Sequence, residues 1–350
     1  IFEISQRAQK RDVTQIDPVI EEAFERMRKA AKNEGNISGV PSGITELDKI
    51  TSGWQKSDLI IIAARPAMGK TAFVLSMAKN IAVNFKRPVA IFSLEMSNVQ
   101  LVNRLIMNVC EIEGDKIKNG RLTNQEWNKM ETKINELMGA PIYIDDTPGL
   151  SIFELQSKAR KLVREKKVEL IIIDYLQLMN ANGANFGSRE QEVSIISRRL
   201  KWIAKELDIP VIALSQLNRN VEKRDSSNSN VEGKKPQLSD LRESGAIEQD
   251  ADMVCFIHRP EYYRIYNDDK TGKDLRGLGQ IIVAKHRNGA TDEVWMRFIG
   301  KYAKFQNENE GFEENIYDMP TSQPATTFQS RMNTSSDPQG AQLDDDIAPF

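Results

Sequence analysis

The sequence lacks the features that would mark a cysteine-bound metal site, a membrane span or a secreted protein. Its two cysteines, Cys110 and Cys255, are far apart and do not have the spacing of metal ligands. Two reduced thiols in a cytosolic protein are the simplest interpretation of such a pair. No apolar run approaches the roughly 20 residues that a transmembrane helix needs, and no secretory signal is recognisable. We therefore expect a cytoplasmic protein that makes no contact with a membrane.

A strong charge of one sign is also missing. The formal net charge of the 350 residues is −2, so a polyanionic partner would have to meet a local basic surface. Apolar residues make up 40% of the chain and charged residues 28%, which is the mix of an ordinary globular protein. The length is sufficient for one large core or two modest ones.

What the sequence does contain is a series of short patterns typical of buried strands, which alternate with helical patterns between residues 36 and 306. Buried strands that alternate with amphipathic helices predict an α/β fold with a mostly parallel central sheet flanked by helices. Ser188 with Gln191 three residues later predicts a helix start. The strand-like runs are residues 59–63, 89–93, 170–174, 211–215, 253–257 and 280–284.

The two ends of the chain have a different character. Residues 1–35 are expected to form a helix, in which Val19, Ala23, Met27 and Ala30 share one face that needs a docking surface. Residues 307–350 lose apolar periodicity, which predicts a disordered acidic tail. Its last residues, QLDDDIAPF, resemble the acidic tip of bacterial single-stranded DNA-binding protein. They could bind a replication partner or simply increase solubility.

The stretch ARPAMGKT follows the 59–63 run and matches the phosphate loop G-x-x-x-x-G-K-[ST], except that alanine replaces the first glycine. The backbone N–H groups of such a loop surround the phosphates, and the following helix adds its positive N-terminal dipole. Gly69 stands where the backbone passes closest to phosphate. The first position only turns the chain out of the strand, which alanine can do when its φ is negative. A chance match in a turn is the alternative. The predicted nucleotide-binding residues are Ala64, Arg65, Pro66, Ala67, Met68, Gly69, Lys70 and Thr71.

Three further polar residues follow predicted strands. Asp174 ends the 170–174 run, where a carboxylate can hold the hydration shell of Mg²⁺ together with the Thr71 hydroxyl. Glu95 follows the 89–93 run and could activate water, and Gln216 follows the 211–215 run and could contact the γ-phosphate. Because ligands of open α/β sheets bind at the carboxyl ends of the strands, we expect all three at one edge. A helix-capping aspartate and a solvated glutamate are the alternatives.

Six segments in order, namely ARPAMGKT, FSLEM, IIIDYLQLM, IALSQLNR, LRESGAIEQDAD and AKHRNG, resemble the bacterial replicative DNA helicase of the DnaB type. The resemblance covers residues 36 to about 306, and residues 1–35 resemble the interdomain linker helix of that family. The family also carries alanine at the first position of the phosphate loop. Its N-terminal helical domain, which binds primase, is expected to be absent from this sequence.

The resemblance implies a RecA-like P-loop ATPase that assembles into a homohexameric ring around single-stranded DNA and unwinds the duplex in the 5′→3′ direction. It also implies primase and a helicase loader as partners, and ATP with Mg²⁺ between subunits. Lys70, Thr71 and Asp174 would hold MgATP, Glu95 would activate water, and Gln216 would sense the γ-phosphate.

Two more segments receive roles from the same resemblance. Lys285 and Arg287 would be inserted from the neighbouring subunit, with Arg287 as the arginine finger, while His286 replaces the usual glutamine between them. Arg242, Glu243 and Gly245 match the family's DNA-contacting pore loop, where an arginine and a glycine suit phosphate contacts. On the residues alone, the first segment could be a basic strand end and the second an ordinary helix start.

Two alternatives from other functional classes stay open at this point. A RadA-type repair ATPase would share the core, although its four-cysteine zinc finger has no C-x-x-C counterpart here. A nucleotide-switched ring scaffold that does not translocate would need the phosphate loop. It would not need Glu95, Arg287 and a DNA-contacting segment together.

Overall fold

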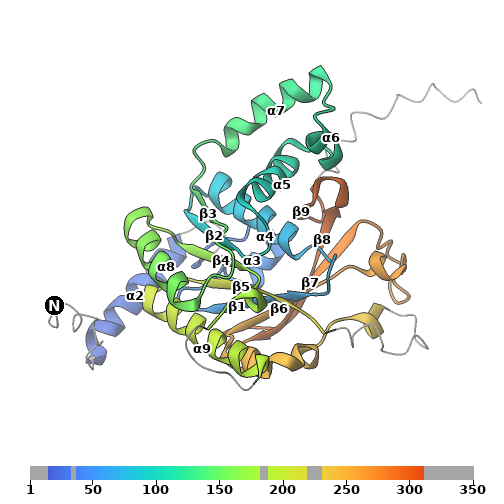
Figure 1. Cartoon of the computed structure of the whole chain (residues 1–350). Coiled ribbons are helices and arrows are strands. Elements are labelled where there is room, and N and C mark those ends of the chain that lie inside the picture. The colour runs from blue at the N-terminus through green and yellow to red at the C-terminus, as the bar shows by residue number, and fades with distance from the viewer. Residues whose placement is uncertain (1–14, 33–36, 182–187, 219–230, 311–350) are drawn as a thin grey trace, which may run out of the picture. The chain divides into compact units, whose positions relative to one another are not determined.

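The computed structural model of the chain describes residues 15–32, 37–181, 188–218 and 231–310. A nine-stranded sheet with the order β3-β2-β4-β5-β1-β6-β7-β8-β9 lies at the centre of the core (Figure 1). The first six strands in this order are parallel, and β7, β8 and β9 continue the sheet antiparallel. The strands are β1 Leu59–Ala64, β2 Val89–Ser93, β3 Ile142–Asp145, β4 Leu170–Asp174, β5 Val211–Gln216, β6 Met253–His258, β7 Leu278–His286, β8 Asp292–Ile299 and β9 Lys304–Asn307.

Helices connect the parallel strands, and side chains cap several of their N-termini. The Ser97 and Thr123 hydroxyls each accept a backbone N–H three residues on, in capping boxes completed by Gln100 and Glu126. Ser188 Oγ accepts the N–H of Gln191, so the predicted helix start is confirmed. The helices are α2 Ile16–Lys32, α3 Thr45–Thr51, α4 Lys70–Lys79, α5 Asn98–Cys110, α6 Gly114–Asn119, α7 Asn124–Leu137, α8 Ile152–Lys166, α9 Arg189–Leu207 and α10 Gly245–Asp250.

Each face of the sheet is covered by its own hydrophobic core. Alternate residues of β1 point to opposite faces, as the twofold repeat of a strand requires. Ile60 and Ile62 pack in a cluster with α4 and α5, whereas Leu59, Ile61 and Ala63 pack in a cluster with α8, α9 and α10. All residues of β1 are fully buried, which explains their continuous apolar sequence.

The predicted fold class is confirmed, and all six predicted strands are present. Three strands were not predicted. The short edge strand β3 is only half-buried, and β8 begins with exposed acidic residues, so neither has the continuous apolar run that identified the others. The third, β9, has only four residues.

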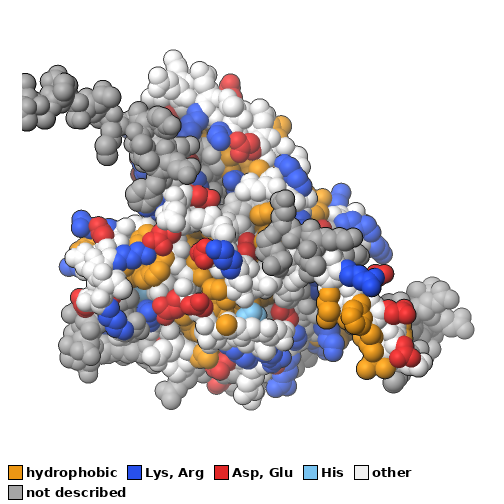
Figure 2. Space-filling view, turned by 180° about the vertical axis from the view of Figure 1, so that it is seen from behind, with side chains coloured by type: hydrophobic (Ala, Val, Ile, Leu, Met, Phe, Trp, Pro, Cys, Tyr) orange, Lys and Arg blue, Asp and Glu red, His pale blue; other side chains and the backbone are white. Residues whose placement is uncertain are grey.

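Outside the core, the helix expected near the N-terminus is present as α2. Its apolar residues are exposed in the structure, including Phe24 (57%) and Met27 (65%). Within the described residues, no helix is both long and apolar enough to cross a membrane. On the face shown in Figure 2, Lys and Arg side chains are interspersed with Asp and Glu, in keeping with the near-neutral net charge.

Candidate nucleotide-binding site

Four neighbouring strands bring most of the predicted site residues to one edge of the sheet. The phosphate loop follows β1, Gln216 ends β5, Asp174 ends β4 and Glu95 lies two residues beyond β2. Because these strands are adjacent and parallel in the order β2-β4-β5-β1, their carboxyl ends form a continuous edge. This is where open α/β sheets bind ligands.

The geometry of the phosphate loop explains why its first position can be alanine. Ala64 is the last residue of β1, is extended and fully buried, and its carbonyl accepts hydrogen bonds from Leu217 N and Lys70 Nζ, each at 3.1 Å. No glycine conformation is needed there. Gly69, in contrast, has φ +94°, and a Cβ at this position would lie 3.0 Å from Cε2 of Phe305. The loop therefore requires glycine at its second conserved position and not at its first.

Lys70 and Thr71 open helix α4, where the backbone N–H groups and the helix dipole favour an anion. Burial lowers the pKa of the Lys70 ammonium, while the nearby Asp174 and Glu95 carboxylates oppose this shift. Thr71 Oγ1 donates to Asp174 Oδ2 at 2.8 Å. Asp174 is only 2% exposed, and its burial raises the pKa of its carboxyl group.

The oxygen pair of Thr71 and Asp174 fits a magnesium ion that is shared with phosphates. Mg²⁺ usually takes one or two protein oxygens and keeps several waters. Within the described residues, no cluster of three or more His, Cys, Asp or Glu side chains could bind a metal ion without other ligands. The donor set therefore matches a phosphate-bound Mg²⁺ and no dedicated metal cage.

Glu95 and Gln216 lie at the same edge and are exposed. Glu95 is near enough to influence both Lys70 and Asp174 electrostatically, and with burial and Asp174 it raises the pKa of Tyr175. Gln177 supports the neighbouring strand end, since its Nε2 donates to Ser215 Oγ at 2.8 Å. The sequence reasoning identified the two exposed residues and missed Tyr175 and Gln177.

Residues from β6 and β8 complete one side of the loop, and none of them was predicted. Arg259 directly follows β6 and donates from Nη1 to the carbonyl of Ala67 at 3.3 Å. Its guanidinium lies 3.9 Å from the centre of the Phe298 ring, and Phe298 in turn packs against Phe305. A signal existed, because Arg259 follows the predicted strand 253–257 as Glu95 follows 89–93. The positive charge of Arg104 in α5 also acts on Asp174 and favours its ionised form.

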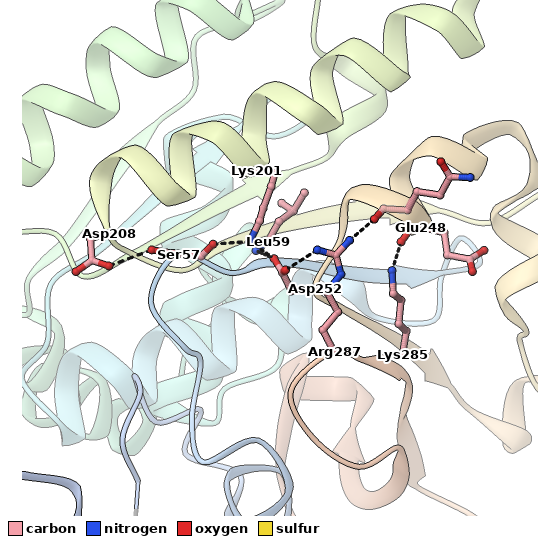
Figure 3. A network of polar contacts seen from close by, with 9 residues as sticks. Ser57, Leu59, Lys201, Asp208, Glu248, Asp252, Lys285 and Arg287 are labelled. Carbon is pink, nitrogen blue, oxygen red and sulfur yellow. Dashed lines mark hydrogen bonds and ion pairs between the residues drawn. The ribbon is translucent and has the colours of Figure 1, made fainter. Parts of the chain in front are cut away.

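Lys285 and Arg287 lie at the opposite end of the strands, where the parallel strands begin. Because β7 is antiparallel, its C-terminal residue His286 pairs with Met253 at the start of β6. Arg287 is therefore beside Asp252 and Leu59, whereas the phosphate loop begins at the far end of β1, about 17 Å away for the five steps from Leu59 to Ala64. Figure 3 shows Arg287 donating to the Asp252 carboxylate and Lys285 contacting the Glu248 carbonyl. The structure does not bring this pair to the phosphate loop of the same chain.

The predicted DNA-contacting residues Arg242, Glu243 and Gly245 belong to a 3₁₀ turn (Leu238–Ser244) and to the start of α10. Their side chains are outside the described part of the structure, as is the whole tail from residue 311. The roles assigned to them stay predictions, as do the roles of the ATP-site residues.

A cavity of about 530 Å³ lies elsewhere, between β2, the edge strand β3 and α8. Its lining includes Phe92, Tyr143 and Lys158 and contains none of the predicted site residues. This cavity is therefore separate from the strand ends that form the candidate site.

A largely parallel sheet, a phosphate loop after a central strand and a helix that begins at the loop lysine define a RecA-like P-loop domain. Comparison with known proteins identifies the particular family. The chain belongs to the DnaB-like helicase C terminal domain family, whose model matches residues 39–307.

Relatives and solved structures agree with this assignment. The chain is 45% identical to the replicative DNA helicase DnaB of Geobacillus stearothermophilus and 43% identical to the replicative DNA helicase DnaC of Bacillus subtilis (strain 168), in each case over 314 residues and 90% of this chain. It spans 66% of the length of each relative.

Two solved structures are similar at about the same level of identity. One is described as an ATPase domain, with TM-score 0.75 and 41% identity over 85% of this chain and 99% of that one. The other is a DnaB-like replicative helicase described with its interactions with primase, with TM-score 0.71 and 40% identity over 87% of this chain and 70% of that one.

Proposed function

We propose that this chain is the ATP-driven motor of a replicative DNA helicase, which forms a homohexameric ring, moves 5′→3′ on single-stranded DNA and unwinds the duplex at the replication fork. One observation carries the proposal. The phosphate loop and the Lys285–Arg287 pair lie at opposite ends of the strands of one sheet, which supports a site that combines the loop of one copy with Arg287 of the next.

In this proposal the loop edge binds and orients ATP. The loop N–H groups and Lys70 hold the outer phosphates, and the Phe298 ring with the Arg259 guanidinium offers an aromatic and cationic surface for the base. Thr71 and Asp174 would hold Mg²⁺, which when bound neutralises charge on the outer phosphates.

Hydrolysis requires a base and a cation in addition. The Glu95 carboxylate is exposed at the same edge and can accept a proton from the attacking water. Gln216, at the end of β5, can contact the γ-phosphate. Arg287 from the adjacent copy would stabilise the negative charge that develops during phosphoryl transfer, with Lys285 beside it. An arginine supplied in trans is worth on the order of a thousandfold or more in kcat.

The DNA and protein partners are proposals of the same account. Arg242, Glu243 and Gly245 would contact the DNA backbone in the centre of the ring, and such contacts grip any sequence. Primase and a helicase loader are the proposed protein partners. Residues 1–35 would serve as the linker that docks through the exposed apolar face of α2, residues 36–306 as the motor, and residues 307–350 as the tail.

Steady-state ATPase assays with Mg²⁺, with and without single-stranded DNA, test the function directly when combined with native mass spectrometry. We expect a six-subunit ring in ATP, hydrolysis that DNA stimulates, and duplex unwinding. Lys70→Ala is the matched control and should abolish all hydrolysis. ATPase activity of a monomer that does not change with protein concentration or DNA would contradict the proposal. A ring that hydrolyses ATP without unwinding would favour a scaffold.

A further inference from the structure

Arg287 lies in a cradle built by its own chain, which the proposed function leaves unexplained. Nη1 of Arg287 donates to Asp252 Oδ1 at 3.2 Å (Figure 3), and Nη2 donates to the carbonyl of Gln249. Its backbone N–H also donates to the Asp252 carbonyl at 2.9 Å. Both terminal nitrogens of the guanidinium and the backbone N–H of Arg287 are therefore bound to the last turn of α10 and to Asp252, which follows it.

Asp252, the centre of this cradle, is itself held from several sides. The residue is 5% exposed. Its Oδ2 accepts a hydrogen bond from the backbone N–H of Leu59 at 2.8 Å and forms an ion pair with Lys201 of α9. Lys201 Nζ also donates to the carbonyl of Ser57 at 2.8 Å. A carboxylate bound to the first residue of β1 and to α9 cannot rotate away from Arg287 without breaking these bonds. Charge-assisted hydrogen bonds of this kind are stronger than neutral ones.

Helix α10 supplies the second wall of the cradle. Its last turn presents the carbonyls of Glu248 and Gln249 to Lys285 Nζ and Arg287 Nη2. The favourable interaction of cations with the C-terminal end of a helix adds to these bonds. The helix is in turn fixed to α9, because Ile247 is fully buried and Ser197 Oγ donates to the Asp250 carboxylate. Both members of the basic pair thus donate to carbonyls of the same helix.

The guanidinium still has donors that can point outward. Arginine carries five N–H donors in a planar fork, and the contacts found in the described residues use one from each terminal nitrogen. The Arg287 side chain remains 45% exposed. An arginine that is anchored on one side and open on the other presents its charge in a fixed direction.

We propose that Asp252 is the positioning residue of Arg287, which it holds, together with the α10 carbonyls, in the orientation that reaches the nucleotide of the adjacent copy. This inference rests on the proposed function, in which Arg287 acts in trans. The physical reason is preorganisation, since a donor that is already fixed needs no reordering when charge develops on the phosphate. Loss of the anchor leaves the charge in place and makes its direction variable.

Asp252→Asn in the full chain tests the proposal, because it keeps the shape of the side chain and removes its charge. We expect kcat for ATP to fall on the order of tenfold to a hundredfold, the effect of a misplaced catalytic group. KM should change by less than about threefold, because the phosphate loop of the same chain lies at the opposite edge. Asp252→Asn combined with Arg287→Ala should be no slower than Arg287→Ala alone, which a merely structural role would not produce.

Asp58→Asn is the charge-matched control. Asp58 is buried in the same cluster and interacts electrostatically with Asp252, Lys201 and Arg287, but within the described residues it forms no hydrogen bond with the guanidinium. Its kcat should stay within about threefold of the parent, since the Asp252 anchor is intact.

The outcomes separate this inference from the proposed function. Arg287→Ala with normal kcat would refute the trans role itself. A low kcat for Arg287→Ala with a normal kcat for Asp252→Asn would overturn only the positioning role. If thermal unfolding shows that Asp252→Asn is not folded, Asp252→Glu decides, because it keeps the charge and the Arg287 guanidinium but moves the anchoring carboxylate by one methylene. We then expect kcat to fall about tenfold or more, as a displacement of about 1 Å can cause, and a parental value would overturn the inference.

Discussion

The two glycine positions of the phosphate loop allow a sharp test of how the loop works. Gly69→Ala places a methyl group on a backbone with φ +94° and 3.0 Å from the Phe305 ring. The left-handed conformation costs an alanine about 1–2 kcal/mol. Phe305 is 1% exposed and packs against Phe73 and Phe298, so its ring cannot move aside easily, and overpacking adds about 1 kcal/mol or more. The total is about 2–3 kcal/mol, and any adjustment of the loop moves the N–H groups that face phosphate.

Ala64→Gly is the matched control, because it restores the glycine that the loop pattern lacks. It removes a fully buried methyl group from β1 and adds chain entropy to the unfolded state, at a combined cost of about 1–2 kcal/mol. Both variants should therefore unfold at a lower temperature, by a few degrees. Only Gly69→Ala should weaken nucleotide binding, by about tenfold or more.

Fluorescence titration with a labelled ATP analogue, beside thermal unfolding of the same samples, separates the two effects. We expect the affinity of Ala64→Gly to remain within about threefold of the parent, less than the 1.4 kcal/mol that a tenfold change represents. A tenfold gain in Ala64→Gly, or parental binding in Gly69→Ala, would show that the assignment of the two positions is wrong.

Three further predictions concern carboxylates. Glu95→Gln should retain ATP binding while hydrolysis in a single-turnover assay falls about a hundredfold or more, as loss of a general base does; loss of binding instead would mean that Glu95 is structural. Asp174→Asn should raise the Mg²⁺ concentration needed for half-maximal ATPase, because one ion-binding oxygen loses its charge, and an unchanged magnesium titration would remove Asp174 from the metal site. Burial and the charge of Asp252 raise the pKa of Asp58 from 3.8 to about 6. The folded state therefore binds the proton of the Asp58 carboxyl more tightly than the unfolded state does. The free energy of unfolding should fall as the pH rises from about 4 to 6, by at most about 3 kcal/mol. Denaturant unfolding should show that this fall is absent in Asp58→Asn, and a fall of equal size would mean that another group causes it.

The sequence predicts the parallel part of the sheet because those strands are buried on both faces. Runs such as LIIIA and LIIID contain three consecutive β-branched isoleucines after an apolar leucine, a pattern typical of strands that are buried on both faces. Strand β8 has no such run, since DEVWMRFI mixes exposed, half-buried and buried positions. The antiparallel extension was therefore foreseen only at β7.

The candidate site divides in the same way. Glu95, Asp174 and Gln216 follow recognisable strands, and the rule that ligands bind at the carboxyl ends of strands places them together. The neighbours of Arg287 could not be found by this reasoning. Asp252 is 35 residues from Arg287 in the sequence and 51 residues from Lys201. Both contacts depend on strand pairing that the apolar pattern does not specify. Periodicity predicts which residues are buried and not which elements are neighbours.

The central claim is that one copy supplies the phosphate loop and the next copy supplies Arg287. Mixing Lys70→Ala and Arg287→Ala subunits in varying ratios, and measuring ATPase activity of the mixed assemblies, tests it most directly. Each variant alone should be inactive, because every interface lacks one of the two groups. In the mixture, some interfaces combine an intact loop with an intact arginine, so activity should return and should be greatest near equal proportions. No recovery at any ratio, in assemblies that native mass spectrometry shows to contain both variants, would contradict the account.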